Sequence, residues 1–218
     1  MPATRTRRRL LMAGLTLPAW VGAADLQRVL APMTDGPFYP PAGWRTRNPV
    51  NDSDWDADLT QVRRGGQTVS ARGEHLALAL RVVDRQGRPI DRAEVEIWQC
   101  DALAQYRHPG VAAEPGRFDP GFQGFGVARS GSDGALAFRT IRPVAYPGRT
   151  PHIHVKLRHA SFGELTSQLF IAGDPGNARD FLWRNLAAAD REPLAMHLQP
   201  ATDAGLRWHT RHALVVPG

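Results

Sequence analysis

The sequence predicts a mainly β fold: a β-sandwich core with long loops and few short helices. The chain of 218 residues contains 18 prolines and 21 glycines, which favour turns and short strands over long helices. Its apolar runs are short and alternate with other residues, as at Leu76, Leu78, Leu80 and Val82, which would share one face of a strand. This length suffices for one full-sized hydrophobic core, so we expect one such domain over residues 25–218.

The same alternation predicts the other strands, which we place at residues 92–99, 165–171 and 207–216. We predict a hairpin over residues 127–141, because residues 132–134 (Ser-Asp-Gly) supply a turn between two alternating runs. Regularly spaced short strands of this kind are typical of a sandwich.

Two segments depart from the strand pattern. Residues 177–190 are the best helix candidate, because Phe181, Leu182 and Leu186 fall at roughly helical spacing. Residues 109–126 are rich in glycine and proline and should form a long loop. Loops of that length are often functional.

The net charge of +6 comes largely from one end of the chain. Residues 1–24 carry Arg5, Arg7, Arg8 and Arg9 and no acid, so the remainder has 27 − 4 = 23 basic and 21 acidic residues, a net of +2. No basic stripe is evident in that remainder. We therefore do not expect nucleic acid as a partner.

Residues 1–24 have the pattern of a twin-arginine-type signal peptide. Residues 7–11 (Arg-Arg-Arg-Leu-Leu) give a charged start, residues 10–20 a short apolar stretch, and residues 21–24 small side chains for cleavage. The apolar stretch is too short for a comfortable membrane span, so we expect none after signal removal. The protein is then periplasmic or secreted; an uncleaved anchor or a disordered tail is the alternative.

The single cysteine, Cys100, excludes an intrachain disulfide. It follows a predicted strand, and we expect a small buried side chain and no nucleophile.

The segment from Tyr146 to His154 carries the chemical signal. His152 and His154 stand at positions i and i+2, so on a strand both imidazoles project from one face. Tyr146 precedes them across a Pro-Gly bend, and Tyr106 lies about 40 residues further upstream in an irregular segment. Our hypothesis is that these four side chains hold one metal ion.

The tyrosines narrow the choice of metal. Two histidines alone would suit zinc, copper or iron. A free phenol has a pKa near ~10 and is neutral at physiological pH, but a strongly charged ion deprotonates it on binding. Phenolate is a hard anionic donor and favours Fe(III). The alternatives are that the histidines are structural and the tyrosines pack, or that other histidines compete as ligands: His108, His159, His197, His209 and His212.

Further motifs occur in one order through roughly residues 30–175. They are Gly-Pro-Phe-Tyr-Pro at 36–40, Glu-Ile-Trp-Gln at 96–99, Tyr-Arg-His at 106–108, Ser-Asp-Gly at 132–134, Phe-Arg-Thr-Ile at 138–141, Tyr-Pro at 146–147, Arg-Thr-Pro-His-Ile-His at 149–154, and Thr-Ser-Gln to Gly-Asp-Pro at 166–175. In these motifs the chain resembles the intradiol ring-cleavage dioxygenases, most closely the protocatechuate 3,4-dioxygenase branch.

The resemblance implies that Tyr106, Tyr146, His152 and His154 bind non-haem Fe(III), and that Tyr146 is the ligand that leaves when substrate binds. It implies a β-sandwich with the iron held between strands and long loops. The implied activity cleaves a catechol-type ring between its two hydroxyl-bearing carbons with O2, giving a cis,cis-muconate-type product.

The resemblance also supplies expectations for the substrate pocket. Arg149 matches an arginine over the substrate ring, with a loop clamp as its alternative, and Gln168 matches a pocket or outer-sphere glutamine. Tyr39 is a candidate pocket residue, with packing of the N-terminal arm as an equal alternative.

The chain departs from the family in two respects. It carries an export signal, and its N-terminal arm lacks the helical dimerisation segment of the catechol 1,2-dioxygenase branch. The sequence does not decide whether the chain forms a homo-oligomer. Two rival functions remain at this point: an exported, non-catalytic transthyretin-like β-sandwich binding module, and a zinc or copper hydrolase-like site.

Overall fold

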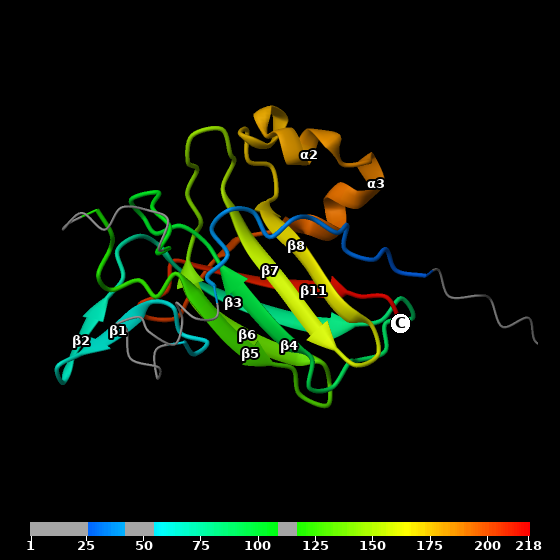
Figure 1. Cartoon of the computed structure of the whole chain (residues 1–218), viewed down its shortest axis with the longest axis horizontal. Coiled ribbons are helices and arrows are strands. Elements are labelled where there is room, and N and C mark those ends of the chain that lie inside the picture. Colours follow the sequence, from blue (N-terminus) through cyan, green and yellow to red (C-terminus); the bar gives the residue numbers. More distant parts are fainter. Residues whose placement is uncertain (1–25, 42–54, 109–116) are drawn as a thin grey trace, which may run out of the picture.

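The computed structural model describes residues 26–41, 55–108 and 117–218. The predicted signal segment and the first part of the predicted 109–126 loop lie outside these ranges. Two sheets packed face to face, shown in Figure 1, confirm the predicted mainly β sandwich. The first sheet has the order β10 (Gln199–Pro200), β11 (Trp208–Val215), β3 (His75–Val83) and β6 (Ala135–Ile141). The second has the order β5 (Phe125–Arg129), β4 (Glu94–Trp98), β7 (His152–His159), β8 (Gly163–Ile171) and β9 (Ala195–Met196).

The hydrophobic core lies between these two sheets. The predicted face of β3 points into it, and β7 contributes its odd-numbered residues from the other side. All of these side chains are fully or almost fully buried: Leu76, Leu78, Leu80, Val82, Ile153, Val155 and Leu157. Because side chains alternate along a strand, the even-numbered residues of β7 must lie on the outer face of the second sheet. His152 and His154 belong to that outer face.

The predicted hairpin over residues 127–141 is wrong in its pairing. The turn is present, with Gly134 at φ 78° and its amide donating to the carbonyl of Gly131. However, β5 pairs with β4 and β6 pairs with β3, so the turn carries the chain from one sheet to the other. Two runs of alternating apolar residues joined by a turn are compatible with a hairpin and also with an arch that connects two sheets. In either arrangement each strand buries one face, so the sequence pattern is the same.

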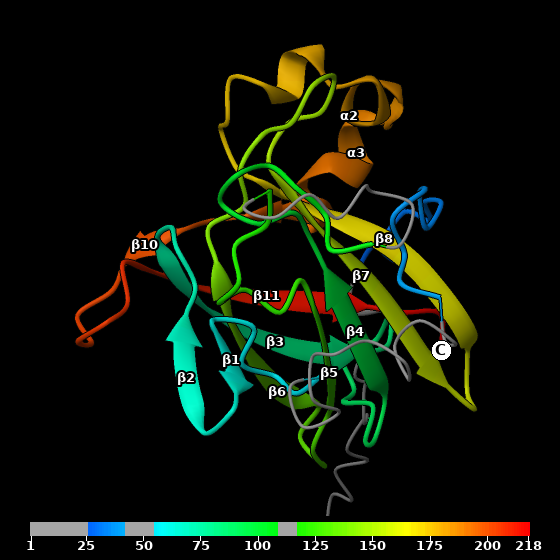
Figure 2. The same cartoon turned by 60° about the vertical axis from the view of Figure 1, so that its left-hand side comes forward.

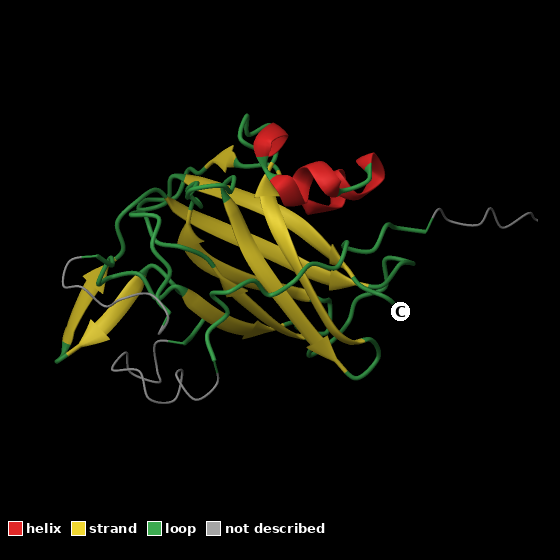
Figure 3. Cartoon of the chain, turned by 45° about the horizontal axis from the view of Figure 1, so that its top comes forward, coloured by secondary structure: helices red, strands yellow, loops and turns green. Residues whose placement is uncertain are grey.

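The predicted helix over residues 177–190 is three short segments: η2 (Asn177–Arg179), α2 (Phe181–Asn185) and α3 (Ala188–Arg191), followed by η3 (Glu192–Leu194). The helical path breaks because Leu186 and Ala187 take extended backbone angles. The predicted apolar face also differs: Phe181 is 57% exposed, whereas Trp183 and Leu186 pack on the core. Figure 3 shows these segments at one end of the sandwich.

Sequence reasoning missed the small hairpin formed by β1 (Gln61–Arg64) and β2 (Gln67–Ser70). Its turn residues are Gly65 and Gly66, both at positive φ, as a two-residue hairpin loop requires. Figure 2 shows it as a separate ribbon beside the sandwich. Among the described residues no helix combines the length and apolar character needed to cross a bilayer.

Candidate metal centre

A second apolar cluster covers part of the outer face of the five-stranded sheet, separate from the main core. Its buried members are Trp98, Cys100, Tyr106 and Phe125, with partly buried Phe38, Tyr39, Trp55, Val127, Val144 and Tyr146 packed on them. This cluster shields the start of β7 from solvent, which is why His152 and His154 are each only 2% exposed. The candidate site therefore lies on the outer face of a sheet, under loops and the N-terminal arm.

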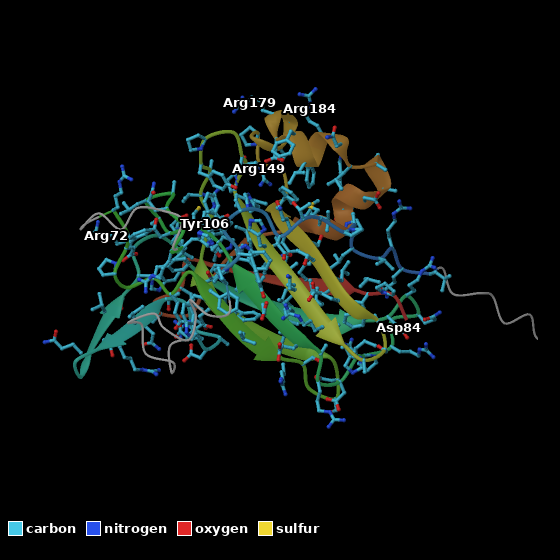
Figure 4. All side chains as sticks on the ribbon, viewed as in Figure 1. Arg72, Asp84, Tyr106, Arg149, Arg179 and Arg184 are labelled. Carbon is cyan, nitrogen blue, oxygen red and sulfur yellow. The ribbon has the colours of Figure 1, made fainter. Side chains whose placement is uncertain are left out.

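All four predicted ligands meet at this point. Ring centroids are 4.9 Å apart for His152 and His154, 5.5 Å for Tyr146 and His152, and 5.6 Å for Tyr106 and Tyr146. The hydroxyl of Tyr106 lies 3.5 Å from Nε2 of His152. In Figure 4 Tyr106 and Arg149 lie toward the end of the sheets where β7 begins, far from Asp84 at the opposite end.

A buried carboxylate fixes the irregular segment that presents Tyr106. The side chain of Asp101 accepts hydrogen bonds from the amides of Leu103 and Gln105 through Oδ1 and from the amide of Asp119 through Oδ2. These bonds close a tight turn in which Ala104 adopts φ 60°. Tyr106 follows directly and is 5% exposed. The phenol is thus held by local backbone geometry as well as by packing.

A second turn presents Tyr146. The amide of Arg149 donates to the carbonyl of Tyr146 at 2.9 Å, across Gly148 at φ 84°. Tyr146 is only partly buried, in contrast to Tyr106. The two phenols therefore differ in access, and Tyr146 is the one that solvent or a substrate can reach.

Hydrogen bonding sets the orientation of His152. Its Nδ1 lies 2.7 Å from the carbonyl oxygen of Thr150, which can only accept, so Nδ1 carries the proton. The lone pair of a neutral ring is then on Nε2, the atom that faces Tyr106. This is the arrangement by which proteins commonly orient a metal-binding histidine.

Packing sets the orientation of His154. The indole of Trp98 stacks on its ring at a centroid distance of 4.6 Å and an interplanar angle of 12°. Trp98 is also the cross-strand partner of His154 in the β4–β7 register. Nδ1 of His154 is buried and has no hydrogen-bond partner within the described part of the chain. Such an orphaned nitrogen is costly unless a group outside the protein satisfies it.

The electrostatics keep both imidazoles neutral. Burial, with the nearby Arg149 charge, lowers the pKa of His152 to about 4. Burial, with the proximity of His152 and Arg149, holds the pKa of His154 well below its ordinary value. Neutral imidazole is the form that binds a metal.

The phenols are shifted in the opposite direction. Burial, with the proximity of Tyr146, raises the pKa of Tyr106 well above its ordinary value. Burial also raises the pKa of Tyr146, against the opposing charge of Arg149. Both therefore stay protonated until a strong cation binds, and binding releases protons.

Arg149 bridges three groups around the site. Its Nη1 donates to the hydroxyl of Tyr146 at 3.4 Å, its Nη2 to Oε1 of Gln168 at 2.5 Å, and its Nε to Oδ2 of Asp180 at 2.8 Å. Gln168 is 1% exposed and pairs directly across from His154 in the β7–β8 register. The structure thus brings Arg149 and Gln168, two of the three predicted pocket residues, to the edge of the four-ring cluster.

Asp180 is a site residue that sequence reasoning missed. Its buried carboxylate accepts from Arg149 and from the amide of Thr150 through Oδ2, and it caps α2 through Oδ1. An aspartate directly before a predicted helix could have indicated its role as an N-cap. Its bond to Arg149 could not be predicted, because it joins residues 31 positions apart and depends on the fold.

Tyr39 contacts the shell around the four rings. Its hydroxyl donates to Oε2 of Glu96 at 2.6 Å and accepts from Nη2 of Arg158 at 3.1 Å, and its ring packs edge-on against Trp98. These contacts match the packing alternative, and its assignment to a substrate pocket stays a prediction.

Three of the five competing histidines have hydrogen-bond partners away from the four rings. His159 bonds Ser161, His197 bonds Glu192 and His212 bonds the carbonyl of Pro193. Within the described ranges no group of three or more His, Cys, Asp or Glu side chains is arranged to hold a metal. A metal at His152 and His154 must therefore recruit other donors, and the two phenols are the ones in contact.

Cys100 is buried as expected, and burial raises the pKa of its thiol to about 12.

The residues fit a ferric ion on the chemistry of the donor set. Two neutral imidazoles and two phenols converge, one buried imidazole nitrogen is unsatisfied, and the site holds no carboxylate among its four rings. Two phenolates plus hydroxide would balance three positive charges, a set that matches a hard trivalent cation better than Zn²⁺ or Cu⁺.

Comparison with known proteins shows which family the chain resembles. A family model described as Dioxygenase matches residues 48–214. The beta chain of protocatechuate 3,4-dioxygenase from Burkholderia cepacia is 34% identical over 148 residues, 64% of this chain and 61% of the relative. Catechol 1,2-dioxygenase 2 from Acinetobacter lwoffii is 29% identical over 188 residues, 77% of this chain and 58% of the relative. The matched part is thus less than two thirds of each relative's length.

A solved structure extends the likeness to the fold. The dioxygenase domain of a dioxygenase–carbohydrate-binding protein fusion from the cellulolytic bacterium Streptomyces sp. SirexAA-E superposes with a TM-score of 0.62 at 27% identity, covering 87% of this chain and 99% of that one. Because the family model covers well over half of the sequence, the chain belongs to the intradiol ring-cleavage dioxygenase family.

Proposed function

We propose that the protein is a non-haem Fe(III)-dependent intradiol dioxygenase. It cleaves a catechol-type ring between the two hydroxyl-bearing carbons and incorporates both atoms of O2, giving a cis,cis-muconate-type product with two carboxylates. The observation that carries the proposal is the convergence of Tyr106, Tyr146, His152 and His154 in one half-shielded cluster. Membership of the dioxygenase family supports it.

Tyr106, Tyr146, His152 and His154 would hold the ferric ion, which would supply Lewis-acid chemistry toward the two oxygens of a catechol. The protein's own contribution begins with positioning. Thr150 and Trp98 fix the two imidazoles, and the Asp101 turn fixes Tyr106. Preorganised ligands of this kind avoid an ordering cost when substrate arrives.

Tyr146 has the properties of a proton acceptor. It is the more accessible phenol, and once ionised its Oη can take a proton from a catechol hydroxyl. Arg149 lies 3.4 Å from that oxygen and stabilises its anionic form. The same guanidinium, held by Asp180 and Gln168, is a fixed cation for negative charge that develops on the ring.

The rival functions are less well supported. A non-catalytic transthyretin-like module would not require two phenols and two neutral imidazoles to meet, and the family match does not favour it. A zinc or copper hydrolase-like site would draw on His, Cys, Asp or Glu, and the described residues contain no such cluster of three.

The test measures metal, colour and oxygen uptake on the same preparation. Purified protein should contain about one iron per chain, be burgundy from phenolate-to-iron charge transfer, and consume O2 with a catechol. Full iron content without colour would contradict phenolate ligation. Coloured iron protein that consumes no O2 with any catechol would contradict the activity while leaving the ligand set intact.

The proposal does not specify which substituent the catechol substrate carries on its ring. Relatives are named for protocatechuate, catechol and hydroxyquinol substrates. An oxygen-electrode panel of these three and larger aryl diols would identify the preferred one.

We also propose export, on the basis of the arginine-rich segment at residues 7–11. Replacing Arg7, Arg8 and Arg9 by lysine should keep the protein in the cytoplasmic fraction. Equal periplasmic recovery of both forms would contradict a twin-arginine route.

A homo-oligomer is a further expectation that light scattering would test.

A further inference from the structure

One face of β7 carries charged residues directly after the two histidines. In the sheet register, His154 lies between Trp98 and Gln168, and the next outward position, Lys156, lies between Glu96 and Thr166. Lys156 is nevertheless 4% exposed at its side chain. A buried ammonium on the outer face of a sheet needs both a cover and a counter-charge.

The cover is the N-terminal arm, by which we mean residues 33–39. The amide of Met33 donates to the carbonyl of Thr166 on β8, and the hydroxyl of Tyr39 reaches Glu96 on β4. The arm therefore crosses three adjacent strands, β8, β7 and β4, within a few residues. Figure 1 shows this segment passing over β8 and β7.

The counter-charge comes from the same arm. Oδ2 of Asp35 lies 2.6 Å from Nζ of Lys156, and Oδ1 accepts from the hydroxyl of Thr166 at 2.8 Å. The ammonium also lies 4.0 Å from the ring centroid of Tyr39. Glu164 is a more distant partner at 3.5 Å. The buried cation thus holds the arm at two points, on either side of its middle.

The middle of the arm touches two of the four candidate ligands. The ring of Phe38 stacks on Tyr106 at a centroid distance of 4.6 Å and an interplanar angle of 17°. Gly36, at φ 72°, lies beside His154, so that a Cβ added there would be in ordinary van der Waals contact with Cε1, at 3.5 Å. Tyr39 in turn packs on Trp98, the residue that stacks on His154. One short segment therefore contacts a phenol and an imidazole from different parts of the chain.

We propose that the arm, locked by the Lys156–Asp35 ion pair, positions Tyr106 and His154 for metal binding, with Phe38 and Asp35 as positioning residues. The inference rests on the proposed function, because it assigns the arm a role toward the same metal centre. Residues that orient metal ligands from outside commonly change metal affinity by about 10- to 100-fold when altered.

The experiment compares Phe38→Leu and Asp35→Asn with two matched controls. Phe38→Leu removes the stacked ring, whereas Phe38→Tyr keeps it. Asp35→Asn keeps the shape and the bond from Thr166 but removes the counter-charge. Asp190→Asn removes the ion pair that Arg28 makes upstream of the arm, away from the four rings.

Three quantities are measured on iron-loaded protein: the wavelength of the phenolate-to-iron band, the rate of iron release to a chelator, and the urea midpoint. Phe38→Leu and Asp35→Asn should shift the band and release iron at least ~10-fold faster. Phe38→Tyr and Asp190→Asn should match the parent. An unshifted band with parental release rates would overturn the proposal, and so would faster release that merely follows a lowered urea midpoint without a band shift.

A separate readout distinguishes this inference from the proposed function. If the parent binds no iron, the proposed function fails. Amide exchange of residues 104–108 and 152–156 in the metal-free protein then decides on the arm. Exchange that is faster in Phe38→Leu and Asp35→Asn than in the controls supports positioning by the arm, and exchange equal to the controls overturns it.

Discussion

Replacing Asp180 by asparagine should weaken both the fold and the site. The Asp180 carboxylate is inaccessible to solvent and receives Nε of Arg149 at 2.8 Å and the amide of Thr150 at 3.0 Å. Asparagine preserves the shape and remains a good N-cap for α2, so the helix start should survive. The charge, however, is lost beside an Arg149 side chain that is only 10% exposed.

The magnitude follows from leaving a buried cation without its partner. Breaking a buried ion pair by removing one member costs about 3–5 kcal/mol. Because Arg149 is slightly exposed and keeps its bond to Gln168, we expect the lower end of this range, a loss of about 3 kcal/mol in the free energy of unfolding. Oxygen uptake should fall by about tenfold or more, since the guanidinium loses the contact that aims it.

Urea unfolding and steady-state oxygen uptake are the assays. Glu192→Gln is the matched acid-to-amide control, because Glu192 pairs with His197 on the surface and should change stability by less than about 1 kcal/mol. A loss below about 1 kcal/mol for Asp180→Asn with unchanged turnover would refute the reasoning that Asp180 holds Arg149 in place.

The same pair predicts a pH dependence. Burial opposes ionisation of Asp180, but hydrogen bonds from Thr150, Arg149 and Trp183 and the Arg149 charge together lower its pKa below the ordinary value. A carboxyl with a depressed folded-state pKa stabilises the fold above the unfolded-state pKa, and this contribution disappears as pH falls through the folded-state value. The stability gap between parent and Asp180→Asn should therefore be full at neutral pH and shrink below about pH 4.

Three further substitutions test separate parts of the structure. Tyr146→Phe should change the charge-transfer absorption and lower turnover, whereas Tyr39→Phe should keep the colour; an unchanged spectrum in Tyr146→Phe would remove that residue from the metal. His152→Ala should lose iron by metal analysis, and retained stoichiometric iron would point to another ligand set. Gly134→Ala should lower the free energy of unfolding, measured with urea, by at least ~2 kcal/mol, because its φ is 78° and a Cβ would lie 2.4 Å from the carbonyl oxygen of Val82. Gly163→Ala, also at positive φ but in open space, should cost only about 1–2 kcal/mol, and equal losses would contradict the clash.

Much of the fold could be predicted from the sequence, because the alternation of side chains along a strand is a local property. The alternation at Leu76 to Val82 predicted β3, and the spacing of His152 and His154 predicted that both rings share one face of β7. These predictions succeed because the period of two is a property of the strand itself. The predicted sandwich followed from the number of such short runs and the turns between them.

The pairing of the strands and the break in the helical segment could not be predicted in the same way. The arch over residues 129–135 and the broken helix after Asn177 carry the same local signals as a hairpin and a helix. Which strand pairs with which depends on the two sheets burying their faces together, and that is a long-range packing effect.

By itself, the sequence determined that two phenols, two imidazoles and an arginine lie in motifs typical of one metal chemistry. Only the tertiary structure decided that Asp180 restrains Arg149, that Trp98 stacks on His154, and that the N-terminal arm crosses β7 above them. The physical reason is that ion pairs and ring stacks join residues far apart in the chain. Their energies arise only when folding removes them together from water.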